Sequence, residues 1–192
     1  GHYMQSESVN IQDKVDAEVL KSTALNEGVG LTGSYSVECI GADGQVKWTD
    51  SIKNLVVTVG RNDLLDKYFA GSAYTAAWYM GLVDNTSFTA YAAGDTLASH
   101  SGWLEFLSYT GSNRTTVSWS AASAGSKATT TTAFSINASG TVLGALMCTT
   151  QAKGTASNGG AGILYSAGSF TGGSRAVVSG DTLNVSYTAA TS

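Results

Sequence analysis

The chain has 192 residues, which is enough for one domain whose core needs neither a metal nor a disulfide. Its net charge of −4 argues against a broad attraction to nucleic acid or to an anionic membrane, so we expect neither as a partner. No apolar run approaches the ~20 residues of a membrane span, and no signal peptide opens the chain, so we expect a soluble, unexported protein.

Composition points to an unusual surface. The chain has no proline, where average usage would give roughly ten, and serine and threonine fill 48 positions. Charged residues make up 12%, about half the usual share, and residues 1–67 carry 16 of the 24. The rest of the surface must therefore consist largely of hydroxyls, glycines and amides, which suits a protein built into an assembly.

Residues 1–30 form the first segment, predicted to be an N-terminal helix or an extended arm. Apolar side chains recur four residues apart, with Glu and Lys between them, and Gly28-Val29-Gly30 ends the pattern. Residues 1–4 are interpreted as an added tag before a native start at Met4. The candidate partner-binding residues of this arm are Ile11, Val15, Val19 and Leu20.

Strand patterns begin after the arm. Residues 35–40 and 45–49 alternate in polarity around Asp43-Gly44, a pair that tolerates the positive φ of a tight hairpin turn. Residues 54–59 are apolar throughout most of their length and predict a buried strand. We therefore expect a hairpin followed by a third strand.

One internal helix is predicted at 61–69. Its apolar residues fall one turn apart, Asn62 or Asp63 is available as an N-cap, and Gly71 follows as a stop. It is the only convincing internal helix in the sequence.

The remainder of the chain is predicted to be almost entirely β. The expected strands are 76–83, 102–109, 114–120, 129–136, 141–149, 162–170, 175–178 and 183–188. Their spacing and their Gly/Ser/Asn/Asp-rich connections are typical of a sandwich, jelly roll or barrel. We predict a mainly β protein in which residues 31–192 form a single antiparallel β-sandwich or jelly-roll-like domain.

The tetrapeptide GDTL occurs at 94–97 and again at 180–183. The second copy stands between two alternating strands, where Asp bonds nearby backbone and Gly takes a left-handed conformation at little cost. A calcium loop would need several carboxylates at alternate positions, and each copy supplies one. Both copies are interpreted as turns.

Catalytic and metal chemistry find little support in the sequence. An enzyme that uses His100 with Asp95 and Glu105 is the weakest hypothesis, because no nucleophile elbow or oxyanion glycine run accompanies the histidine. Cys39 and Cys148 lie in apolar stretches without metal-ligand spacing and are interpreted as buried free thiols. We expect no catalytic residues, no metal and no cofactor.

Several segments together resemble a family of small virion proteins of tailed bacteriophages. They are NLVVTVGRNDLLDKYFAG, WYMGLV, GDTLASHSGWLEF, YTGSNRTTVSW, FSINASGTVLGALM and GDTLNVSYT, and the resemblance covers about residues 33–190. Members of this family are described as capsid decoration, head-associated or tail-fibre-like proteins.

The resemblance implies a structural protein on the exterior of the phage particle, made in the host cytoplasm. The leading hypothesis is a capsid decoration (cement) protein, a dimer or trimer whose arm reaches onto the major capsid protein or a neighbouring subunit. The alternative is a tail-fibre module that binds host glycan. The sugar rings of the glycan would stack on the aromatic residues Trp103, Tyr109 and Trp119 if these side chains are exposed.

Overall fold

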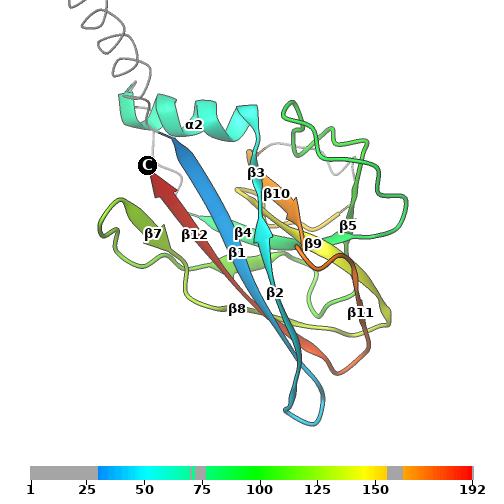
Figure 1. Cartoon of the computed structure of the whole chain (residues 1–192). Coiled ribbons are helices and arrows are strands. Elements are labelled where there is room, and N and C mark those ends of the chain that lie inside the picture. Colours follow the sequence, from blue (N-terminus) through cyan, green and yellow to red (C-terminus); the bar gives the residue numbers. More distant parts are fainter. Residues whose placement is uncertain (1–29, 70, 72–76, 155–161, 192) are drawn as a thin grey trace, which may run out of the picture. The chain divides into compact units, whose positions relative to one another are not determined.

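The described chain folds into two antiparallel β-sheets that pack face to face, with one helix across one end (Figure 1). The structure is a computed structural model, and it describes residues 30–69, 71, 77–154 and 162–191. The elements are β1 (Leu31–Ile40), β2 (Val46–Lys53), β3 (Leu55–Val56), α2 (Thr58–Phe69), β4 (Trp78–Asp84), β5 (Leu104–Phe106), β6 (Thr115–Val117), β7 (Ser126–Ala128), β8 (Thr132–Ser135), β9 (Gly140–Cys148), β10 (Leu164–Ser169), β11 (Arg175–Val177) and β12 (Thr182–Thr191).

The first sheet has five strands and is built around β1 and β12. Its order is β2-β1-β12-β7, and β8 also pairs with β12. β1 and β12 are paired along their whole length, from Leu31 opposite Thr191 to Ile40 opposite Thr182. In both strands alternate residues are buried, because large apolar side chains point inward and hydroxyls point outward.

The second sheet has seven strands in the order β3-β10-β9-β4-β5, with β11 beside β9 and β6 beside β4. Residues 142–148 of β9 are buried without interruption, as expected for a strand that is covered on both faces of its sheet. One face packs against the first sheet. The other is covered by the connection between β4 and β5.

Two apolar clusters correspond to these two faces. The larger lies between the sheets and includes Tyr35, Tyr187, Met80 and Met147. The smaller places Leu97 and Trp103 of the connection against the outer side of β9 and β10. The sandwich is therefore packed on both sides of its seven-stranded sheet.

The helix differs from its prediction. The stretch 54–59 is not one strand, because β3 covers only Leu55–Val56 and α2 already begins at Thr58. Asn62 and Asp63 are consequently inside the helix, and neither is its cap. The predicted stop is consistent with the helix end at Phe69, two residues before Gly71.

Most other expectations of the fold are confirmed, including the mainly β class, the antiparallel two-layer sandwich and the hairpin of β1 and β2. β7 was missed, because Ser126-Lys127-Ala128 has neither β-branched nor aromatic residues. The predicted arm, with Ile11, Val15, Val19 and Leu20, lies outside the described residues.

Candidate functional site

The two GDTL segments form the same turn. Ala92 N–H donates to Asp95 Oδ2 over 2.9 Å, and Asp95 N–H donates to the Ala92 carbonyl over 3.0 Å. Val178 and Asp181 make the matching bonds at 3.0 and 3.1 Å. The turn interpretation is confirmed, although each carboxylate bonds three residues back and only Gly180 has a left-handed φ, of 95°.

Each turn carboxylate has a further partner from elsewhere in the chain. Asp95 accepts the Trp103 indole N–H over 3.0 Å, and the His100 ring stacks on Trp103 with 3.7 Å between centroids. Asp181 accepts a hydrogen bond from the Lys47 ammonium over 2.9 Å and forms an ion pair with it. The first turn thus fixes the connection over the smaller core, and the second ties β12 to β2.

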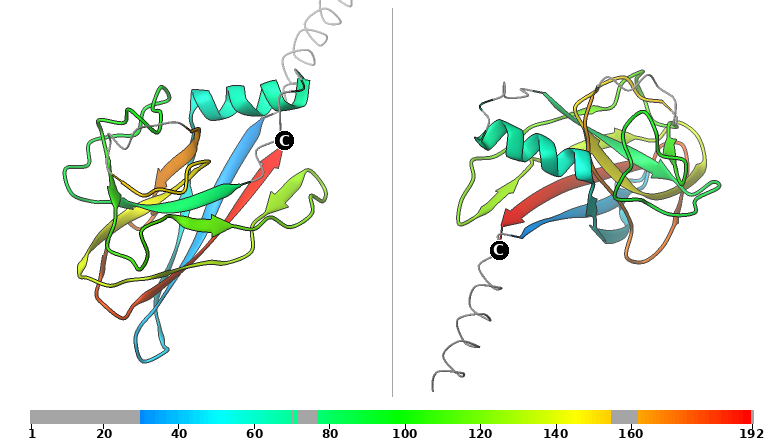
Figure 2. Two further views of the ribbon diagram at one scale, coloured as in Figure 1. Left: turned by 180° about the vertical axis from the view of Figure 1, so that it is seen from behind. Right: turned by 90° about the horizontal axis from the view of Figure 1, so that it is seen from above.

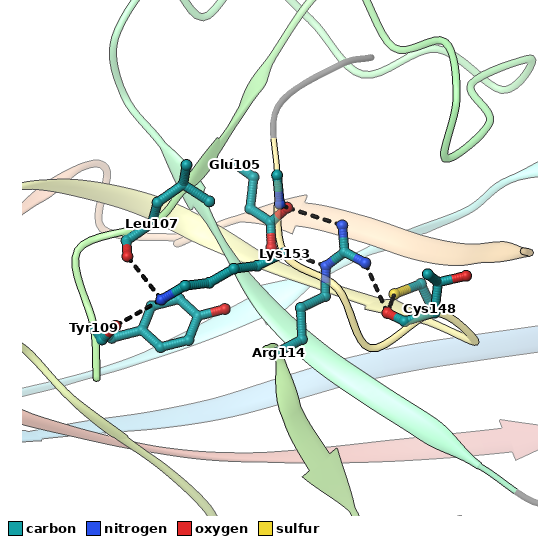
Figure 3. A network of polar contacts seen from close by, with 8 residues as sticks. Glu105, Leu107, Tyr109, Arg114, Cys148 and Lys153 are labelled. Atoms are coloured by element: carbon teal, nitrogen blue, oxygen red, sulfur yellow. Dashed lines mark hydrogen bonds and ion pairs between the residues drawn. The ribbon is translucent and has the colours of Figure 1, made fainter. Parts of the chain in front are cut away.

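A buried ion pair holds the segment that follows β9 (Figure 3). Arg114 donates to both carboxylate oxygens of Glu105, at 2.8 and 2.9 Å, and both side chains are almost fully buried. Arg114 Nη1 also donates to the Thr150 carbonyl over 2.7 Å, and Gly154 N–H donates to Glu105 over 2.9 Å. Burial alone would lower the pKa of Arg114, but the hydrogen bonds to Glu105 raise it, so the guanidinium stays charged.

Lys153 extends this network to the chain after β5. Its ammonium donates to the carbonyls of Leu107 and Tyr109 over 3.0 and 2.6 Å, and it lies 3.8 Å from the centroid of the Tyr109 ring (Figure 3). Burial raises the pKa of the Cys148 thiol, which donates to Thr150 O over 3.4 Å. These contacts fasten residues 150–154 to β5 and the chain after it.

The three residues of the enzyme hypothesis belong to two different clusters. Asp95 and His100 both contact Trp103, and His100 Nδ1 lies 3.0 Å from the Trp103 carbonyl oxygen. Glu105 instead binds Arg114. In this arrangement the histidine and both carboxylates hold neighbouring parts of the fold.

The described residues contain neither a cluster that would hold a metal ion nor a helix that would cross a membrane. Among the residues that the structure describes, no three His, Cys, Asp or Glu side chains gather where they would hold a metal ion. Within the same residues, no helix combines the length and the apolar character needed to cross a membrane.

The three aromatic residues proposed to bind glycan lie in different environments. Trp103 and Tyr109 are each 1% exposed and belong to the two cores, so neither offers a ring face to a sugar. Trp119 is half-buried and packs edge-on to Trp78, with 6.5 Å between ring centroids. Trp119 lines a concave surface.

That surface is an apolar hollow beneath α2, which we call the α2 groove. It has a volume of about 510 Å³. Its lining is Gly60, Asp63, Leu64, Lys67, Tyr68, Trp78, Trp119, Lys127, Tyr165 and Ala189. Two further views show α2 lying across the end of the sandwich where β1 begins and β12 ends (Figure 2).

The α2 groove exists because the helix touches the sheets mainly through its first turns. Gly60 is the buried residue of α2, and a Cβ there would lie 2.7 Å from the Tyr165 carbonyl oxygen. The last turns stand away from the sheets. The sequence did not predict this hollow, because the spacing of apolar residues indicates a helix and does not show how closely it packs against the sheets.

The outward side of the five-stranded sheet is a second broad surface, here called the hydroxyl face. Strand register places the following outward-facing residues on it: Thr32, Ser34, Ser36, Glu38, Ile40, Val46, Thr49, Ser51, Lys53, Ser126, Ala128, Ala133, Ser135, Thr182, Asn184, Ser186, Thr188 and Ala190. Glu38 and Lys53 are the charged members of this set. The face is therefore mostly polar and almost uncharged, with Ile40 and Val46 as its large apolar members.

No protein-family model, curated protein or solved structure matches this chain.

Proposed function

We propose that this chain is a structural virion protein of a tailed bacteriophage, most simply a capsid decoration protein that stabilises the head. In this role its partners are the major capsid protein and further copies of itself, and its place is the exterior of the particle. It needs surfaces that fit other proteins, and no reaction chemistry.

The observation that carries this proposal is the hydroxyl face. Serine, threonine, asparagine and alanine side chains on β1, β2, β12, β7 and β8 form a continuous outward surface. A buried hydroxyl that stays unpaired costs about 1–3 kcal/mol, and a hydrogen bond to the covering protein offsets that cost, whereas buried charges cost several kcal/mol each. Contacts of this kind, repeated over many copies, bridge capsomers by multivalency.

The proposal also agrees with the structural role of the buried polar side chains. The Glu105–Arg114 pair and the Asp95–Trp103 bond each hold a connection against the sandwich. Such a construction favours a rigid body with binding surfaces. The tail-fibre alternative is weaker, because Trp103 and Tyr109 are inside the cores.

The test is co-sedimentation of the purified chain with procapsids and with expanded heads of its phage. We expect saturable binding to expanded heads, and loss of that binding in Ser36→Arg, which puts a charge at the centre of the hydroxyl face opposite Ser186. Ser139→Arg, in an exposed turn outside the face, serves as the matched control and retains binding.

Two outcomes would count against the proposal. A wild-type chain that ignores both procapsids and expanded heads but adheres to host cells belongs to the tail. Saturable head binding that Ser36→Arg leaves unchanged assigns the capsid contact to another surface.

A further inference from the structure

The last two turns of α2 expose a run of large apolar side chains, here called the α2 patch. It consists of Leu64, Leu65, Tyr68 and Phe69, which are 41%, 49%, 79% and 77% exposed. Single exposed apolar residues are ordinary, but a contiguous group on one element marks an interaction site. Their spacing of one and four residues makes the group continuous along the helix.

The α2 patch lies beside a hollow of matching character. Leu64 and Tyr68 belong to both the patch and the α2 groove, whose other side is formed by Trp78, Trp119 and Tyr165. The same helix, α2, thus contributes side chains both to the protruding α2 patch and to the wall of the α2 groove. Such a surface is self-complementary: across a two-fold axis, the projection of each copy can enter the hollow of the other.

Size supports a second copy as the occupant. Tyr68 and Phe69 together expose roughly 230–390 Å², on the scale by which an aromatic residue buries about 150–250 Å². Standard stable interfaces bury about 800 Å² per partner. The two leucines and the rim of the α2 groove extend the aromatic pair toward that area.

Charge does not oppose self-association at this surface. Asp63 and Lys67, which both line the α2 groove, pair with each other within one copy over 2.8 Å. Lys127, on the opposite rim, donates to the Ser120 carbonyl over 2.8 Å. The core of the interface would therefore be apolar and aromatic, with its charges at the edge, as in other stable interfaces.

We propose that the α2 patch and the α2 groove form the interface between two copies of this chain, with Tyr68 and Phe69 of each copy inserted into the α2 groove of the other. This adds the self-association surface to the proposed function and does not depend on the head as partner.

The experiment is mass photometry and light scattering of the full chain over a concentration series. We expect a wild-type dimer, and at least a tenfold weaker dimerisation in Tyr68→Ser/Phe69→Ser. Val178→Ser, which removes an exposed apolar side chain outside α2, is the control and leaves the dimer unchanged. Because Tyr68 and Phe69 are exposed, the double variant should remain folded and retain the wild-type far-ultraviolet circular dichroism.

A second variant tests the hollow and leaves the projection intact. Ala189→Leu narrows the α2 groove from the β12 side and should also weaken dimerisation. A wild-type chain that is monomeric throughout the series, or a dimer that persists in both variants, overturns the inference. The inference is also overturned if the wild-type chain is a monomer and the Tyr68→Ser/Phe69→Ser variant loses head binding. In that case the α2 patch would be the contact with the capsid.

The two proposals fail separately. A chain that dimerises through the α2 patch but ignores heads retains this interface and loses the decoration role. A chain that binds heads but never dimerises retains the decoration role and loses this interface.

Discussion

The carboxylate of Asp95 accepts the indole N–H of Trp103 over 3.0 Å, and this bond holds the connection that covers the outer side of the seven-stranded sheet. Trp103 is fully buried, so the bond is shielded from water. Loss of this hydrogen bond leaves the buried Asp95 carboxylate with one donor fewer.

Trp103→Phe is expected to lower the free energy of unfolding by about 2–4 kcal/mol, because it removes both this donor and part of a buried ring. Urea denaturation monitored by circular dichroism measures the effect. Trp48→Phe, at a half-buried ring that packs edge-on to Phe170, is the control and should cost less. Equal losses in the two variants would contradict the role assigned to the Asp95 bond.

Stability should depend on pH through Asp181. Burial would raise the pKa of its carboxyl, but the hydrogen bonds from Lys47 and from Val178 N–H lower it below the ordinary 3.8. A lowered folded-state pKa stabilises the protein above the unfolded pKa, and that stability is lost as pH falls through the folded value. We therefore expect the free energy of unfolding to decline as pH drops below about 4.

Asp181→Asn tests this assignment. At pH 7 it should cost about 1 kcal/mol, less than the roughly 1.5–3 kcal/mol of a hydrogen bond to a charged group, because Lys47 is 39% exposed and water screens the pair. The gap between variant and wild type should shrink as pH falls below 4 in urea titrations. Parallel curves down to the lowest pH would rule out Asp181 as the titrating group.

The Glu105–Arg114 pair should respond differently to single and double substitution. Glu105→Leu or Arg114→Met alone leaves an uncompensated buried charge and should cost about 3–5 kcal/mol. The double variant removes both charges and should be more stable than either single variant. Chemical denaturation of all four proteins gives the coupling energy, and additive losses would show that the two side chains act independently.

The two cysteines should react only when the chain unfolds. Cys39 and Cys148 are free and buried, and burial raises the pKa of Cys39 to about 11 and raises that of Cys148. Thiolate is the reactive form, so the native protein should react slowly with a disulfide reagent at pH 8 and rapidly, at two thiols per chain, in denaturant. Fast native labelling would contradict the burial of both side chains.

The sandwich was predictable because its strands alternate regularly. In the central parts of β1 and β12 the inward positions carry Tyr, Val, Leu or Cys, and the outward positions carry Ser, Thr, Glu or Asn, so sequence alone assigns each face. The turn at Asp181 was predictable for a similar reason, because two such strands flank it. The contact of Asp181 with Lys47 was not predictable, since 134 residues separate the two side chains.

The α2 groove could not be derived in the same way. Leu64, Leu65, Tyr68 and Phe69 have helical spacing, and in a single chain such spacing predicts burial. The structure leaves them outside because Gly60 brings only the first turns close to Tyr165. An apolar pattern predicts that these side chains are shielded from water. It does not show whether the same chain or another protein covers them.

The pairing of β1 with β12 sets a condition on biosynthesis. Leu31 must meet Thr191, so the central strand pair of the first sheet closes across nearly the full length of the domain. Such contacts carry a large loop-closure cost and slow folding. On a translating ribosome, β1 has to wait for its neighbour until β12 has left the exit tunnel, so the first sheet cannot be completed before that point.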